Sequence, residues 1–269
     1  MKYKKIVITG AGSGIGKQAA ICLARQGHTV YATTQFEEEC TSLLHIAQKE
    51  KLSLLSFKLD ITNEKDIQKL EKIEFDTFIN NAAIGTSGSI IEIDIQKVYA
   101  VFQTNIFATL SITQFVLKKL IEQNHGTIIF VSSLAGIIPI AFLSPYCASK
   151  SAINNFASSI RQELKQLNKP NIKIKLIELG AYHTGFNQKN YRKKYEWMKH
   201  HSYFKDNWKN MKEKEEKLWE FIEYYHFNSA IKKYMQAVHS KNNHFKYTAP
   251  KIQSIFVKFV KIMDLLFSM

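Results

Sequence analysis

Short apolar runs alternate with longer stretches of helical periodicity along the first two thirds of the chain. The apolar runs predict buried strands at residues 5–9, 29–33, 52–59, 77–80, 127–132 and 172–179. Between them, apolar residues recur three and four positions apart and predict helices at residues 15–25, 40–50, 63–73, 95–122 and 146–168. This alternation predicts an α/β fold, a doubly wound parallel sheet with helices on both faces.

The regular alternation stops at about residue 183. Residues 185–241 are rich in lysine and aromatic residues, so we interpret them as an insertion over the edge of the sheet where ligands of such folds bind. A charged helix at 211–225, a last strand at 245–249 and a final helix at 251–267 are also expected. One domain over residues 1–269 is therefore predicted, with a core at about 4–184, a substrate lid at about 185–241 and an amphipathic C-terminal helix at about 251–267.

The final helix has one narrow polar stripe on an otherwise apolar surface. The stripe steps by three and four positions and consists of Lys251, Ser254, Lys258, Lys261 and Asp264. The helix is too short and too charged to span a bilayer comfortably. Two arrangements fit it: packing against the insertion or a partner subunit, or a membrane interface with the lysines toward anionic head groups.

Composition and cysteine usage are those of a soluble globular protein. Hydrophobic residues make up 45% and charged residues 22% of the 269 positions. Cys22, Cys40 and Cys147 have no repeated spacing and leave one cysteine unpaired in any disulfide scheme, which favours a reducing, cytoplasmic compartment. The basic N-terminus precedes an apolar run of residues 6–8 alone, too short for a signal peptide.

The positive charge is concentrated in the last third of the chain. Of the formal net charge of +14, residues 181–269 carry +9 and residues 1–180 carry +5. This distribution suits an acidic surface such as anionic lipid, and a solvated lysine-rich surface explains it equally well. Mixed acidic and basic residues at 211–223 argue against a nucleic-acid groove, so no nucleic-acid partner is expected.

A glycine-rich turn joins the first strand to the first helix. It reads Thr9-Gly10-Ala11-Gly12-Ser13-Gly14-Ile15-Gly16. Backbone N–H groups at such a turn, together with the helix dipole, face an anion. Because the turn lies between a strand and a helix near the start of the chain, it predicts a dinucleotide phosphate site.

Tyr146 and Lys150 are candidates for proton chemistry. On a helix that starts at Pro145 they are one turn apart and share a face. A lysine ammonium at about 4 Å would favour the phenolate by roughly 4 kcal/mol at an effective dielectric of about 20. That energy lowers a phenol pKa by about three units, toward the operating pH. Taken alone, such a pair is more often an ordinary surface pair.

These motifs, in this order, resemble the short-chain dehydrogenase/reductase family over about residues 4–186. The resemblance implies a Rossmann-type fold, NAD or NADP as cofactor, and hydride transfer between the nicotinamide and a small-molecule alcohol or carbonyl; no metal is expected. The implied catalytic residues are Asn105, Ser133, Tyr146 and Lys150. The cofactor-binding residues are expected to be Thr9, Gly10, Gly12, Ser13, Gly14, Ile15, Gly16, Thr34, Gln35, Asp60, Asn81, Ala82, Tyr146, Lys150, Gly180 and Thr184.

The resemblance also implies a role for each catalytic residue. Tyr146 would donate or accept the proton, and Ser133 would hydrogen-bond the substrate oxygen. Lys150 would lower the phenol pKa and bind the nicotinamide ribose. Asn105 would hold a water that links Lys150 to solvent.

Two positions depart from the family pattern. Ala83 replaces a glycine and Leu179 replaces a proline, and neither change removes a reacting group. Two other functions remain to be weighed: a dinucleotide sensor without catalysis, and a scaffold that docks on a membrane. A sensor would not need the complete catalytic set, which favours the enzyme.

The choice of cofactor depends on the residues after the second strand. Residues 32–35 contain no carboxylate, and Thr34 cannot repel a 2′-phosphate, so the sequence favours NADP over NAD. Ser13, Thr33 and Gln35 could donate hydrogen bonds to that phosphate. None of these is the arginine or lysine that NADP-using family members often carry.

The substrate itself is not specified by any motif. The candidates for an aromatic lid are Tyr182, His183, Phe186, Trp197, Phe204 and Trp208. Such a lid favours a lipophilic substrate, although these side chains could equally pack within the insertion. Some family members that act on lipophilic substrates have comparable basic, apolar C-terminal segments, which favours membrane contact through residues 251–267. A homo-oligomer is also expected.

Overall fold

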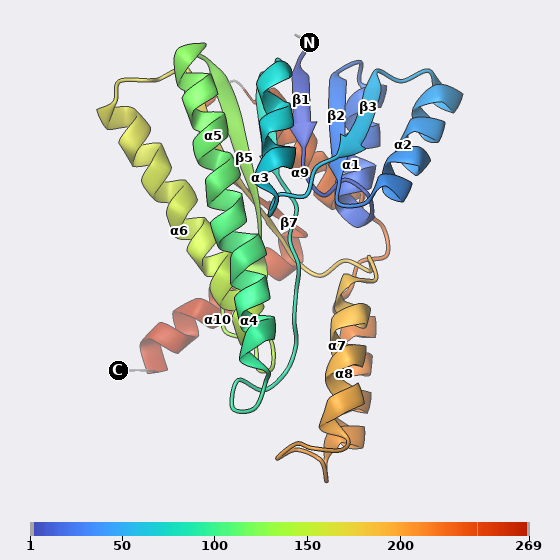
Figure 1. Cartoon of the computed structure of the whole chain (residues 1–269). Helices are drawn as coiled ribbons and strands as arrows, with labels where there is room; N and C mark the ends of the chain where they lie inside the picture. Colours follow the sequence, from blue (N-terminus) through green and yellow to red (C-terminus); the bar gives the residue numbers. More distant parts are fainter. Residues whose placement is uncertain (1–2, 241, 268–269) are drawn as a thin grey trace.

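A seven-stranded parallel sheet forms the middle layer of the computed structural model, which describes residues 3–240 and 242–267 (Figure 1). The strand order is β3-β2-β1-β4-β5-β6-β7, and it changes direction between β1 and β4. The strands are β1 Lys5–Ile8, β2 Thr29–Thr34, β3 Leu54–Lys58, β4 Thr77–Asn80, β5 Gly126–Ser133, β6 Ile172–Leu179 and β7 Lys246–Ala249. The predicted doubly wound α/β fold is therefore confirmed.

Helices cover both faces of this sheet. One face carries α1 (Gly14–Arg25), α2 (Glu37–Glu50) and α9 (Asn228–His239), which share an apolar core with the sheet. The other face carries α3 (Glu64–Gln68), α4 (Ile95–Phe102), α5 (Thr109–Glu122) and α6 (Ser144–Gln166), around a second core. Short strands rich in Ile, Val and Phe are buried on both sides, as parallel strands require.

The predicted long helix at 95–122 contains a change of helix type. A π-helical segment, Gln103–Ala108, joins α4 to α5 and contains Asn105. By length and composition Ile95–Glu122 could cross a membrane. Its residues Ile112, Val116 and Leu120 are nevertheless fully buried in the core that this helix shares with the sheet.

Two helices project from the edge of the sheet where the strands end. They are α7 (Phe186–Met198) and α8 (Trp208–Ile222), and Figure 1 shows them side by side below the sheet. Helix α9 lies within the part of the chain expected to form the lid, but it packs on the sheet, where Ala230, Tyr234 and Ala237 are fully buried. The projecting part is therefore shorter than residues 185–241.

Helix α10 (Lys251–Phe267) follows β7 directly and leaves the body of the protein near the same edge (Figure 1). Ser254 and Val257 are buried, and Ser254 donates to the Thr248 hydroxyl at 3.1 Å. Ser254 thus faces the protein, although the sequence placed it in the polar stripe. The apolar side chains on the outer face are more than half exposed: Ile252, Ile255, Phe256, Phe259, Ile262 and Leu266.

Candidate active site

The glycine turn is held against the end of β4 by close backbone packing. Gly10 has a φ of 63°, and a Cβ atom there would lie 2.7 Å from the Ala82 Cα. A Cβ on Gly16 would likewise overlap the side-chain amide of Asn81. These contacts leave no room for side chains and explain why glycine occurs at both positions.

Thr9 holds the glycine turn against the end of β4 through its hydroxyl group. Its hydroxyl donates to the Ile79 carbonyl (3.3 Å) and accepts from the backbone N–H groups of Asn81 (3.0 Å) and Ala82 (3.1 Å). Thr9 is buried and does not line the cavity described next. It joins the glycine turn to the loop after β4 and does not make the direct cofactor contact that the sequence predicts.

One cavity of about 1160 Å³ runs from the glycine turn to the projecting helices. Its volume exceeds the roughly 300–1,000 Å³ of sites for drug-sized ligands, so it can accept a dinucleotide together with a second molecule. Fifteen of the predicted site residues line it: Gly10, Gly12, Ser13, Gly14, Ile15, Gly16, Gln35, Asp60, Asn81, Ala82, Ser133, Tyr146, Lys150, Gly180 and Thr184.

The turn fits the diphosphate of a dinucleotide. A Cβ on Gly14 would meet nothing nearer than the Thr184 Cβ at 3.5 Å, so the backbone is open to the cavity. The first turn of α1 contains no acidic residue, and Ser13 caps it without a side-chain hydrogen bond. Free N–H groups at a helix N-terminus are the ordinary protein site for a phosphate.

Asp60 is a fixed carboxylate beside Gln35 at one end of the cavity, called the nucleoside end because the sequence predicts cofactor contacts for both residues. It accepts hydrogen bonds from the Thr62 backbone N–H (2.9 Å), the Thr62 hydroxyl (2.7 Å) and the Gln35 amide (3.1 Å). Burial alone would raise its pKa, but these hydrogen bonds outweigh burial and hold the pKa of Asp60 below its usual value. The carboxylate is therefore ionised and available as an acceptor.

Thr34 does not face the cavity. It is fully buried at the end of β2, and its hydroxyl lies 2.8 Å from the Phe36 carbonyl and 2.9 Å from the Cys40 sulfur. The expected contact between Thr34 and the cofactor is therefore not supported by its position.

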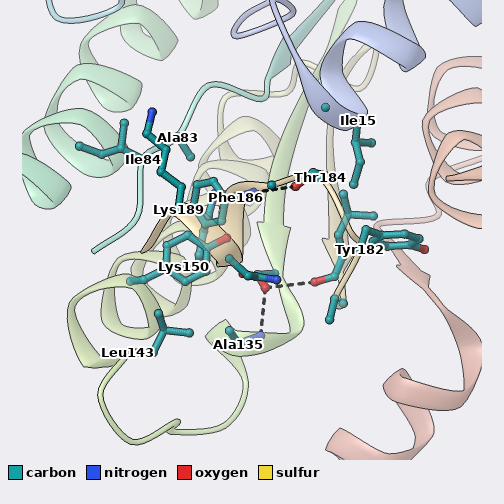
Figure 2. A pocket seen from close by; sticks show the side chains of 18 of the residues that line it. Ile15, Ala83, Ile84, Ala135, Leu143, Lys150, Tyr182, Thr184, Phe186 and Lys189 are labelled. Carbon is teal, nitrogen blue, oxygen red and sulfur yellow. Dashed lines mark hydrogen bonds between the residues drawn. The ribbon is translucent and has the colours of Figure 1, made fainter. Parts of the chain in front are cut away.

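Tyr146 and Lys150 lie in the first turns of α6 and line the cavity, and Figure 2 shows Lys150 there. The Lys150 ammonium lies 5.7 Å from the centre of the Tyr146 ring and donates to the Val131 carbonyl at 3.0 Å. Burial raises the pKa of Tyr146 to about 12, although a hydrogen bond with Ser133 lowers it in part. Burial also lowers the pKa of Lys150 to about 8.

These pKa directions correct the prediction made from spacing. Helical spacing alone predicts an ammonium about 4 Å from the phenol in a surface-like dielectric, an arrangement that lowers the phenol pKa. In the structure both groups are desolvated, and desolvation favours the neutral form of each. The pKa of Tyr146 is consequently raised in this arrangement.

Ser133 lies at the end of β5 beside Tyr146. Its hydroxyl donates to the Leu179 carbonyl at 3.0 Å and accepts from the Ala135 N–H at 3.1 Å, contacts drawn in Figure 2. A hydroxyl rotates freely, so its proton can be redirected from Leu179 to a ligand oxygen.

Asn105 acts through other residues, because it does not line the cavity. Its amide exchanges two hydrogen bonds of 2.9 Å with the backbone of Ile84 and donates to the Ser149 hydroxyl at 3.0 Å. Ser149 in turn donates to the Tyr146 carbonyl at 2.8 Å. Asn105 therefore positions the first turn of α6, and the π-helical segment carries it to that place.

Phe186 covers the tyrosine from the start of α7. The two rings lie 5.5 Å apart at 53°, and Phe186 also packs on Gly85. Of the expected lid aromatics, Tyr182 and Phe186 line the cavity, whereas His183, Trp197, Phe204 and Trp208 do not. The apolar wall on α7 and α8 comes mainly from Tyr195, Met211, Leu218, Trp219 and Ile222.

An ion pair crosses this apolar wall. The buried Lys194 ammonium contacts the Glu215 carboxylate at 2.6 Å, and the Tyr195 hydroxyl donates to the same carboxylate at 2.7 Å. Burial lowers the pKa of Lys194, although Glu215 opposes that shift. The pair joins α7 to α8, and no motif in the sequence pointed to it.

Two further lining residues come from distant parts of the chain. Tyr234 of α9 donates to the Asn81 side chain at 2.7 Å. Gln253 of α10 accepts from the Ala181 N–H (2.8 Å) and donates to the Ile222 carbonyl (2.6 Å). No local sequence motif identifies either residue as part of the site, because the fold alone brings their hydrogen-bond partners close to them.

Comparisons with known proteins agree with this geometry. The sequence profile described as short chain dehydrogenase matches residues 4–195. The uncharacterized oxidoreductase YusZ of Bacillus subtilis is 34% identical over 191 residues, which cover 68% of this chain and 67% of the relative. The 3-ketodihydrosphingosine reductase of Bacteroides thetaiotaomicron is 31% identical over 192 residues, 69% of this chain and 66% of that protein. The matched stretch thus spans about two thirds of these relatives.

The fold as a whole has solved counterparts. A short chain dehydrogenase/reductase from Burkholderia phymatum, crystallised in complex with NAD, superimposes with a TM-score of 0.81 over 99% of this chain and 95% of its own. Its sequence identity is 18%, so this likeness concerns the fold alone. In the part of the chain that the structure describes, no group of three or more His, Cys, Asp or Glu could hold a metal ion.

Proposed function

Because the chain belongs to the short-chain dehydrogenase family, we propose that it transfers a hydride between NAD or NADP and an alcohol or carbonyl substrate. The observation that carries this proposal is one continuous cavity, which joins the open glycine turn to Ser133, Tyr146 and Lys150. The nucleotide complex of the Burkholderia relative supports it. The nicotinamide, when bound, supplies or accepts the hydride, and the protein handles the proton.

The side chains can serve this reaction in distinct roles. Tyr146 gives the proton to the substrate oxygen in reduction and takes it in oxidation. Ser133 hydrogen-bonds the same oxygen. The Lys150 ammonium favours the phenolate that forms as the proton leaves, and Asn105 keeps the start of α6 in place through Ser149.

We further propose a lipophilic substrate. Apart from lysines and Glu215 of α7 and α8, the space beyond Tyr146 is bounded by apolar and aromatic side chains of α7, α8 and the loop before α6, among them Phe142, Phe186, Met211, Leu218, Trp219 and Ile222. Burial of an alkyl chain there is favourable by about 0.8 kcal/mol per methylene group. The name of the Bacteroides relative, a 3-ketodihydrosphingosine reductase, supports a substrate of this class.

A substrate panel tests the proposal. Long-chain ketones and alcohols, and matched short hydrophilic ones, are incubated with each nucleotide while the absorbance of the reduced nicotinamide is followed. We expect kcat/KM to rise with chain length. Turnover of the hydrophilic compounds alone would contradict the lipophilic substrate, whereas nucleotide binding without any turnover would favour a dinucleotide sensor.

The outer face of α10 favours a second function, contact with a membrane surface. Phe256 and the buried Val257 line the cavity, and Phe256 and the neighbouring Phe259 are both more than half exposed. Gln253 ties this helix to the end of α8, where Phe221 is 89% exposed. Exposed apolar side chains therefore occur on both helices that Gln253 joins.

Charge on the same helix is consistent with an anionic lipid surface. Lys251, Lys258 and Lys261 are all exposed, and each such lysine near an anionic membrane contributes about 1 kcal/mol. We propose that α10 lies in the interface and that a lipophilic substrate passes from the lipid into the adjoining cavity.

A further inference from the structure

A carboxylate lies against the glycine turn, and it comes from α2. A Cβ atom placed on Gly12 would overlap both carboxylate oxygens of Glu39. Glu39 belongs to the first turn of α2, is partly buried and lines the nucleoside end of the cavity. The chain thus has an acidic group at this place, although the end of β2 has none.

The other polar groups nearby do not compensate the charge. Gln35 is engaged with Asp60 at 3.1 Å, and Asp60 is itself a carboxylate. Lys17 of α1 donates to the Ser42 hydroxyl at 2.8 Å and does not line the cavity. Among the described residues, the lysines that do line the cavity belong to α6, α7 and α8: Lys150, Lys189, Lys194 and Lys214.

We propose that Glu39 makes the protein select NAD over NADP. Resting on the hydride-transfer function proposed above, this inference assigns Glu39 as an acceptor for the ribose hydroxyls, the role that an acidic residue after the second strand has in dinucleotide folds. A 2′-phosphate would bring about two negative charges to the end of the cavity that holds the Glu39 and Asp60 carboxylates, whereas the described lysines that line the cavity all belong to α6, α7 and α8. This choice replaces the NADP preference drawn from Thr34, which is buried.

The acidic row on α2 supplies a matched control. Glu38 precedes Glu39 in the same helical turn, is exposed and does not line the cavity. Glu38→Gln and Glu39→Gln therefore remove the same charge from the same helix end, and only one of them changes the cavity wall.

Binding of NAD and NADP to the purified full-length protein is measured by isothermal titration calorimetry, without substrate. We expect NAD to bind at least about tenfold more tightly than NADP. Glu39→Gln should reduce this ratio by about tenfold or more, chiefly through tighter NADP binding. Glu38→Gln should leave it within about twofold of the parent value, since that charge is solvated.

The outcomes separate this inference from the proposed function. NADP binding that equals or exceeds NAD binding in the parent protein would overturn the role of Glu39 and leave hydride transfer standing. Equal effects of Glu38→Gln and Glu39→Gln would also overturn it, because a general charge effect would then suffice. Binding of neither nucleotide by the folded protein would overturn the proposed function together with the inference.

Discussion

Burial shifts the pKa values of the two central side chains of the site in opposite directions. Burial raises the pKa of Tyr146 to about 12 and lowers the pKa of Lys150 to about 8. At neutral pH the phenol is protonated, which is the form that carbonyl reduction requires, and the lysine is charged. The ammonium can then favour the phenolate that forms as the proton leaves. Above pH 8, loss of the Lys150 charge should slow the reduction.

We expect Lys150→Met to abolish turnover and to raise stability at pH 7. The pKa of Lys150 falls from 10.5 to about 8 on folding, so at pH 7 the folded state carries the full cost of a buried charge. Between pH 8 and 10.5 the folded lysine is neutral while the unfolded one is charged, so this cost shrinks as pH rises. After allowing for the lost hydrogen bond to Val131, we expect the free energy of unfolding of Lys150→Met to exceed that of the parent protein by roughly 2 kcal/mol at pH 7.

Thermal unfolding of both proteins at pH 7 and pH 10 measures this difference. The advantage of Lys150→Met should be largest at pH 7 and smaller at pH 10. The control is Lys72→Met. Because Lys72 is exposed, the free energy of unfolding of this variant should stay within about 0.5 kcal/mol of the parent value. A Lys150→Met variant less stable than the parent at pH 7 would contradict a net cost of burying the Lys150 charge.

At the scale of elements, α10 links the cavity to the outer surface. Its first turns hold the loop at Ala181 and the end of α8 through Gln253. Its outer side chains, such as Ile255 and Phe259, are more than half exposed. Deletion of the whole helix would also remove Gln253 from the cavity, so substitutions on the outer face are a cleaner test of membrane contact.

The full-length protein should co-sediment with vesicles of phosphatidylcholine and phosphatidylglycerol, and less with phosphatidylcholine alone. The double variant Ile255→Gln/Phe259→Gln should lower the vesicle affinity by about tenfold or more, since each apolar side chain contributes roughly 1.5–3 kcal/mol when buried. The control is Leu55→Gln/Leu167→Gln, which changes two similarly exposed side chains elsewhere.

Two results would contradict the membrane contact. In one, the parent protein and both double variants sediment alike. In the other, Ile255→Gln/Phe259→Gln leaves vesicle binding unchanged and converts a dimer into a monomer in analytical ultracentrifugation. That result would assign the outer face of α10 to a partner subunit.

For the whole molecule, the sequence predicts those features that depend on residues close together in the chain. Strand periodicity, the glycine turn and the spacing of Tyr146 and Lys150 are all legible within a few residues, and together they predict the sheet and most of the cavity lining. Glu39 and Gln253 reach the cavity only because α2 and α10 fold back on it. The pKa of Tyr146 likewise depends on desolvation by distant elements, which spacing alone does not reveal.

Hydride transfer itself is tested most directly with an isotope label. The protein is incubated with NADH or NADPH deuterated at the transferring position of C4 and with the best carbonyl substrate of the panel, and the alcohol product is analysed by mass spectrometry. The parent protein should place one deuterium on the carbinol carbon. Tyr146→Phe should bind the nucleotide with similar affinity and form this product about 10²–10⁴-fold more slowly. A parent protein that binds the nucleotide and forms no deuterated alcohol, or a Tyr146→Phe variant that matches its rate, would contradict the proposed mechanism.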